Sequence, residues 1–120
     1  MATVALILVS LVALIHVYIF VLESVLWAKP QGLKTFRMDA AKAEATRVLA
    51  LNQGVYNLLL AAGLVWGLAS GAELVPRAGF FLIAIAIAGI VGGLTVAKNI
   101  LFVQTVPAAL ALVALFVAYR

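Results

Sequence analysis

Apolar residues fill four long stretches of the chain, and short polar segments separate them. The stretches cover about residues 2–28, 39–70, 78–97 and 100–119. Each provides close to the ~20 apolar residues that a helix needs to cross a hydrocarbon core. The pattern therefore predicts an all-α protein, a four-helix transmembrane bundle that forms a single transmembrane domain over residues 1–120.

Local signals predict where the first two helices end and begin. Pro30 disfavours helix at the residue before it, so the first helix should stop near residue 28. Residues 31–38 are predicted to form a polar loop, and Asp39 can cap the second helix. That helix would be about 48 Å long, which exceeds a ~30 Å hydrocarbon core. Its first turns should therefore extend into the cytosol.

Two further prolines bear on the second half of the chain. Pro76 lies in a predicted connection over residues 71–77, and Pro107 is predicted to kink the fourth helix. Lys98 and Asn99 should form a tight turn between the third and fourth helices.

Composition excludes several classes of protein. The chain is 68% hydrophobic and 10% charged, far from the balance of a soluble domain. It has no cysteine, which excludes disulfides, thiolate metal sites and cysteine nucleophiles. No sequence motif indicates a nucleic-acid module, a P-loop or a dinucleotide site. We expect membrane lipid rather than nucleic acid as the partner of the basic residues; no metal site is predicted and no cofactor is indicated.

The cationic residues predict the orientation of the chain in the membrane. Basic residues near the cytoplasmic ends of helices favour the positive-inside arrangement. Six of the eight basic residues lie in or beside the first and third connections. This bias predicts that these connections are cytoplasmic and that both termini are outside. We expect the protein to lie in the cell membrane, which is the inner membrane if the source is a bacterium. The six are Lys29, Lys34, Arg37, Lys42, Arg47 and Lys98, against Arg77 and Arg120 on the other side.

Polar residues within the apolar stretches gather in the cytoplasmic half. At ~1.5 Å per residue, Glu23 lies about 8 Å from the cytoplasmic helix end, Asn57 about 15 Å and His16 about 18 Å. Polar side chains are costly in hydrocarbon, so we expect them to face the bundle interior and meet. The predicted pocket opens to the cytoplasm. Its ligand-binding residues are His16, Glu23, Trp27, Asn52, Gln53, Tyr56 and Asn57, and its edge is Arg47, Lys98, Asn99 and Gln104.

Each of these residues also has a structural interpretation. Glu23 can titrate or bind a ligand, or it can pair with Arg47, Lys98 or Asn52. The amides of the second helix can line a ligand or join helices by hydrogen bonds. Gly54 fits close approach by another helix or by a ligand.

Gly89 and Gly93 form a small-residue face in the third helix, which predicts helix packing or a subunit interface. A bundle this small also predicts a homo-oligomer.

Three functions remain open at this point. The polar residues could hold the head of a small or lipid-like amphiphile. Alternatively, His16 or Glu23 could act as acid or base in a membrane enzyme on a lipophilic substrate, with Tyr56 or an Asn orienting that substrate. A third interpretation is a small proton-coupled transporter in which Glu23 carries the proton.

Two segments resemble a known family. They are residues 16–23 (HVYIFVLE) with Trp27, and residues 52–57 (NQGVYN) followed by residues 60–67 (LAAGLVWG). They resemble the small integral membrane proteins of domain-of-unknown-function family 1304, and the resemblance covers essentially the whole chain. It implies that His16, Glu23 and the Asn52–Gln53–Gly54 block are family features, and it implies no activity.

The layout is also similar to that of the membrane-associated eicosanoid and glutathione metabolism proteins, with Arg47 and Asn52 in a comparable region. That family has a Glu shortly after the Asn, where this chain has Val55 and Tyr56.

Overall fold

The computed structural model describes all 120 residues, and every regular element in it is helical. The predicted all-α fold is therefore confirmed. The elements are α1 (Ala2–Phe20), the π-helical turn η1 (Val21–Val25), α2 (Pro30–Phe36), α3 (Ala40–Leu68), the 3-10 turn η2 (Gly71–Glu73), α4 (Leu74–Thr95), the π-helical turn η3 (Leu101–Thr105) and α5 (Val106–Ala118).

Four helical segments are long and apolar enough to cross a membrane. They are Ala2–Val25, Ala40–Leu68, Gly71–Thr95 and Leu101–Tyr119. They correspond to the four apolar stretches of the sequence.

The prediction of a polar loop between the first two long helices is wrong in part. A short helix, α2, occupies Pro30–Phe36, with Pro30 at its first position, where a proline needs no N–H partner. Arg37 ends α2 in the left-handed region at φ 51°, and its N–H bonds to the carbonyl of Leu33. Gly32 is buried, and a Cβ there would overlap the carbonyl oxygens of Leu26 and Trp27.

Two helix boundaries also differ from the prediction. The first helix ends at Val25 rather than residue 28. The helix α4 begins at Leu74, so Pro76 lies in its first turn instead of in a connection. A proline is accommodated there because first-turn N–H groups have no partner within the helix.

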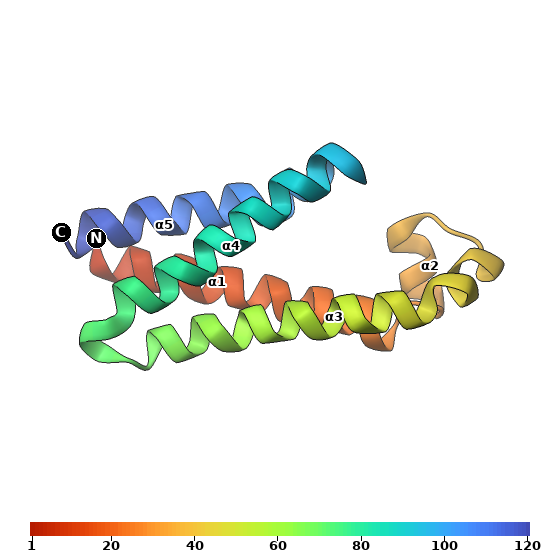
Figure 1. Cartoon of the computed structure of the whole chain (residues 1–120), viewed down its shortest axis with the longest axis horizontal. Helices are drawn as coiled ribbons and strands as arrows, with labels where there is room; N and C mark the ends of the chain where they lie inside the picture. Colours follow the sequence, from red (N-terminus) through yellow and green to blue (C-terminus); the bar gives the residue numbers. More distant parts are fainter. The chain divides into compact units, whose positions relative to one another are not determined.

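The chain forms two compact units, residues 1–15 with 60–120, and residues 16–59. In the first unit α4 and α5 lie side by side (Figure 1). The core of this unit is entirely apolar. Its largest fully buried side chains are Val9, Val12, Leu64, Leu82, Ile85 and Leu115.

Glycines bring α4 close to η3 within the first unit. A Cβ on Gly89 would overlap the hydroxyl of Thr105, and a Cβ on Gly93 would overlap Leu101. The Thr105 hydroxyl donates to the carbonyl oxygen of Ala86 at 3.0 Å. The predicted helix-packing role of Gly89 and Gly93 is therefore confirmed, and both glycines are buried within the chain.

A π turn stands where Pro107 was predicted to kink the fourth helix. The N–H of Val106 bonds to the carbonyl of Leu101, five residues back, and Pro107 follows at the start of α5. A proline lacks its own N–H and clashes with the carbonyl four residues earlier. The wider π turn before Pro107 accommodates both the missing N–H and the ring.

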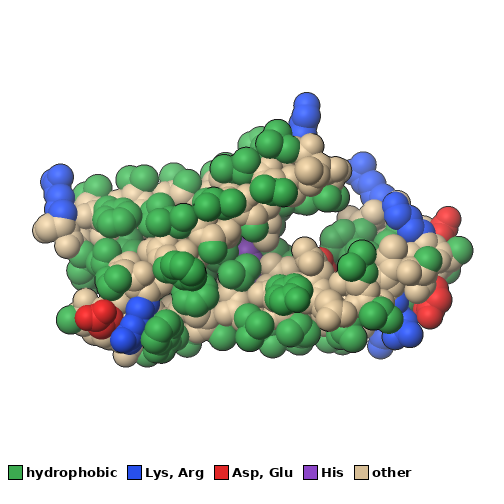
Figure 2. Space-filling model, viewed as in Figure 1, with side chains coloured by type: hydrophobic (Ala, Val, Ile, Leu, Met, Phe, Trp, Pro, Cys, Tyr) green, Lys and Arg blue, Asp and Glu red, His purple; other side chains and the backbone are tan.

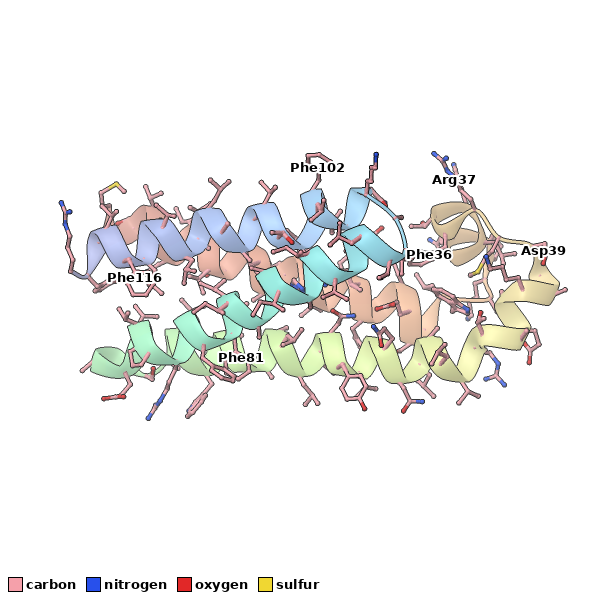
Figure 3. The ribbon with its side chains drawn as sticks, turned by 45° about the horizontal axis from the view of Figure 1, so that its top comes forward. Phe36, Arg37, Asp39, Phe81, Phe102 and Phe116 are labelled. Atoms are coloured by element: carbon pink, nitrogen blue, oxygen red, sulfur yellow. The ribbon has the colours of Figure 1, made fainter.

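The second unit contains η1, α2 and the first part of α3. Asp39 caps α3 as predicted, because its carboxylate accepts from the backbone N–H of Lys42 at 2.7 Å. Charged side chains gather around the α2 end of this unit (Figure 2). Figure 3 labels Phe36, Arg37 and Asp39 there, where α2 passes into α3.

Candidate functional site

Hydrogen bonds join η1 and the segment after it to α3 within the second unit. The hydroxyl of Ser24 donates to the carbonyl oxygen of Leu51 at 3.0 Å, and the indole N–H of Trp27 donates to the hydroxyl of Thr46 at 3.0 Å. The later residue of the first segment, Trp27, bonds to the earlier residue of α3, Thr46, so the two segments run antiparallel. These bonds hold the end of the first span against the start of the second.

Small residues on α3 allow this close approach. Ala43, Ala50 and Gly54 are buried. A Cβ on Gly54 would overlap the hydroxyl of Ser24. Small residues let helix backbones pack closely in membranes. The prediction of close approach at Gly54 is confirmed, and the approaching element is η1.

A further polar contact between η1 and α3 pairs Glu23 with Asn57. The Asn57 amide donates to the Glu23 carboxylate at 2.7 Å and to the carbonyl oxygen of Gln53 at 3.1 Å. Asn57 is buried and Glu23 is half-buried. A polar group in an apolar environment is costly unless it is hydrogen-bonded. The pair meets that requirement for the Asn57 amide and for one oxygen of Glu23.

Glu23 lies inside the π-helical turn η1. The turn is closed by the bond from the N–H of Leu26 to the carbonyl of Val21 at 2.9 Å. Such turns insert one extra residue into a helix and are frequent at functional sites. Here Glu23 and Ser24, consecutive in the turn, both reach α3.

Trp27 anchors the chain after η1. Besides its bond to Thr46, its ring lies 4.7 Å from that of Phe36, centre to centre, at an angle of 44°. Thr46 in turn donates to the carbonyl oxygen of Lys42 at 2.8 Å. The indole is therefore fixed between α2 and α3.

A small open-sided cavity lies beside Trp27. Its volume is about 220 Å³, and every residue around it belongs to the second unit. Its lining residues include one hydroxyl-bearing residue, Ser24, and two basic residues, Lys29 and Arg47. The remaining lining residues are Val25, Trp27, Ala28 and Leu51.

The two cations of this cavity have no strong anionic partner. Arg47 contacts Glu44 through Nε alone, at 3.4 Å, and both side chains are more than half exposed. An exposed pair of this kind contributes little. Lys29 makes no ion pair within the chain, and no carboxylate lines the cavity. The site can therefore accept an external anion against Lys29 and Arg47.

The structure brings together only part of the predicted ligand-binding set. Glu23 accepts a hydrogen bond from Asn57, and Trp27, just after η1, donates one to Thr46 on α3. His16 is fully buried and has an interaction partner within the chain. A direct pairing of Glu23 with Arg47 or Asn52 is not found; its partner is Asn57.

The expectation that the polar side chains of α3 all face inward is wrong for Asn52, Gln53 and Tyr56. All three side chains are exposed, Tyr56 by 63%. Asn52 donates to the carbonyl oxygen of Val48 on its own helix at 2.8 Å. For Asn52 the physical reason is helical phase: five residues separate Asn52 from Asn57, which places them about 140° apart around the helix.

The four residues predicted for the pocket edge belong to two different units. Arg47 lines the cavity of the second unit. Lys98, Asn99 and Gln104 belong to the first unit, in the connection after α4 and in η3. Lys98 and Asn99 are exposed and Gln104 is half-buried with a partner. Their place at the edge of a pocket stays a prediction.

Sequence reasoning missed Ser24, Lys29 and Thr46 as site residues. Lys29 was interpreted only as a topological signal. A sequence feature was available: Lys29 follows Trp27 by two residues, and Arg47 directly follows Thr46. A tryptophan beside a cation at one helix end, and a second cation at the facing helix end, are typical of the membrane interface.

Comparisons with known proteins confirm the family resemblance of the sequence. The family described as protein of unknown function (DUF1304) matches residues 10–116. An uncharacterised protein, YpaA, from Lactococcus lactis subsp. lactis (strain IL1403) is 32% identical over 118 residues, which cover 97% of this chain and 99% of the relative. No solved structure matches.

Proposed function

The chain belongs to the DUF1304 family, and we propose that it is an integral membrane protein that binds an anionic, lipid-like amphiphile in the second unit. The ligand head would occupy the cavity, against Lys29, Arg47 and Ser24. Its apolar part would lie on the exposed apolar side chains that continue from the cavity wall.

The observation that carries the proposal is the pair of uncompensated cations in one cavity. Lys29 and Arg47 line the same cavity, and the only ion pair that either makes is the exposed contact of Arg47 with Glu44. An anion in the cavity would be attracted by both charges. Phosphate and carboxylate groups suit these two cations. A guanidinium binds either group through two N–H donors, and an ammonium attracts either group as a point charge. A volume of about 220 Å³ suits a head group rather than a whole amphiphile.

An apolar track on the protein surface supports the amphiphilic nature of the ligand. Leu51 lines the cavity and is 44% exposed. Val48 and Val55 are also exposed and lie three residues before and four residues after it on α3. Residues at this spacing share one face of a helix. Across the cavity, Val25 is exposed on η1.

The charge distribution supports a cytoplasmic position for this cavity. Lys29 and Arg47 belong to the basic first connection, which the positive-inside rule assigns to the cytoplasm. In this arrangement both termini lie outside and the cavity faces the anionic leaflet of the cell membrane. The Glu23–Asn57 pair would serve as a positioning contact that holds η1 against α3.

The alternatives have no comparable support from a contact. Glu23 bonds to an amide rather than to a second titratable side chain, so an acid–base pair for an enzyme does not form around it. A proton-coupled transporter needs a route to the other side of the membrane, and the first unit has an entirely apolar core.

Trp27 offers a direct test of binding. The chain has two tryptophans, so a Trp66→Phe background leaves Trp27 as the only tryptophan, and Trp27 lines the cavity. Detergent-solubilised protein is titrated with short-chain phosphatidylglycerol or with phosphatidylcholine of the same chain length. We expect a saturable change of Trp27 emission with the anionic lipid and a much weaker one with the zwitterionic lipid.

Charge variants control for non-specific attraction. Lys29→Gln with Arg47→Gln should weaken the phosphatidylglycerol response roughly 30-fold, if each cation contributes ~1 kcal/mol. Lys34→Gln with Arg37→Gln removes the same charge from the same connection but outside the cavity, and should retain the response. Equal responses to both lipids, or equal losses in both double variants, would contradict the proposal.

A further inference from the structure

One face of α3 carries polar groups that the chain itself does not cover. We define it as the amide seam: Ala45, Leu49, Asn52, Tyr56 and Leu59, spaced alternately by four and three residues. All five side chains are exposed, Leu49 by 71%, Tyr56 by 63% and Leu59 by 58%. Spacing of this kind aligns side chains on one stripe and is the pattern of a helix-pairing seam.

The seam is costly if it faces lipid. The Gln53 amide, at its edge, and the Tyr56 hydroxyl make no hydrogen bond within the chain. Asn52 donates one N–H to Val48 and keeps an acceptor oxygen and a second N–H without a partner. Asn52 lies five residues past Arg47, about 8 Å into the apolar part of α3. Unpaired polar groups at such depth are expensive in hydrocarbon.

We propose that the amide seam is an interface between two copies of this chain, in which α3 pairs with α3 through Asn52. An amide carries both donor and acceptor groups, so Asn52 complements a second Asn52. Two copies inserted the same way run parallel and present Asn52 at the same depth. A symmetric dimer of this kind brings identical residues of its seam together.

The other contacts of the seam agree with this arrangement. Leu49 and Leu59 supply apolar contacts on either side of the amide, and Ala45 leaves room where the helices meet. A single polar residue within an otherwise apolar seam fixes register and oligomeric state in helix pairs. The seam shares no residue with the cavity, so the inference does not depend on the proposed ligand.

Cysteine crosslinking of the full chain in its membrane tests the interface. The chain has no cysteine, so each single substitution gives one reporter. Leu49→Cys and Tyr56→Cys lie on the seam. Leu51→Cys and Leu58→Cys are the matched controls. Each lies two residues after one of the seam reporters and therefore about 200° from it around the helix. The native side chains at both control positions are also exposed. Under mild oxidation we expect disulfide-linked dimers at residues 49 and 56, several-fold above the controls.

A second measurement isolates the amide. Asn52→Leu should weaken self-association in vesicles, measured by energy transfer between labelled copies, by roughly threefold to tenfold, the scale of one interhelical hydrogen bond in a membrane. Asn52→Gln should retain most of it. Equal crosslinking at all four reporters, crosslinks to a different protein, or full association of Asn52→Leu would each overturn the inference.

Discussion

At the residue scale, the missing side chain of Gly54 lets η1 lie against α3. A Cβ there would overlap the hydroxyl of Ser24. We expect Gly54→Ala to lower the free energy of unfolding in detergent by about 1–3 kcal/mol, the cost of overpacking. Thermal unfolding followed by circular dichroism measures it. Ser24→Gly in the same chain should restore part of the loss. Gly79→Ala is the control, because the nearest atom to its Cβ is 4.0 Å away.

Asn57 should matter more than the neighbouring amide. Asn57→Leu leaves the half-buried carboxylate of Glu23 without its donor, so we expect a loss of about 1–3 kcal/mol in the free energy of unfolding. Gln53→Leu removes an exposed amide that bonds to nothing within the chain and should change stability by less than ~0.5 kcal/mol. Glu23→Gln keeps an acceptor for Asn57. Comparable losses in the Asn57 and Gln53 variants would show that the buried contact does not stabilise the fold.

The sequence predicts the grouping of Glu23 with Asn57, but not the direction of Asn52 and Tyr56. Glu23 and Asn57 were assigned to one polar cluster because both lie in the cytoplasmic half, and they do bond. The same interpretation also assigned Asn52 and Tyr56 to that cluster. Their angular position on the helix separates them from Asn57, and it makes them an exposed face instead.

At the scale of elements, α4 and η3 depend on glycine contacts. A Cβ on Gly89 would come within 2.8 Å of the backbone nitrogen of Thr105, which cannot move as a side chain can. Gly92→Ala meets only the flexible side chain of Ile100 at 3.0 Å. We therefore expect Gly89→Ala to lower the thermal midpoint in detergent clearly more than Gly92→Ala. A larger effect at Gly92 would contradict the packing described for α4.

Long apolar elements were predictable and short polar ones were not. Hydropathy and the ~20-residue length of a span identify all four long helices, because the bilayer imposes both. The seven residues of α2 carry loop signals, Pro30 and Gly32, which here serve as a helix start and a close contact. The π turns at Val21–Val25 and Leu101–Thr105 have no hydropathy signal.

At the scale of the whole molecule, the basic residues predict the orientation of the chain. Thr35 is exposed on α2 in the first connection, and Ala72 is exposed in the second. In intact cells, a membrane-impermeant thiol reagent should label Ala72→Cys and not Thr35→Cys. Permeabilised cells should show labelling of both. Labelling of Thr35→Cys in intact cells would reverse the orientation and place the cavity on the outer side.

The central claim is that Lys29 and Arg47 form a binding site for an anionic amphiphile. Native mass spectrometry of the gently solubilised protein tests it most directly, because a retained molecule adds its mass to the chain. We expect wild type and Lys34→Gln/Arg37→Gln to retain an anionic species, and Lys29→Gln/Arg47→Gln to lose it while remaining folded. No retained species in any of the three, or retention in all three, would contradict the claim.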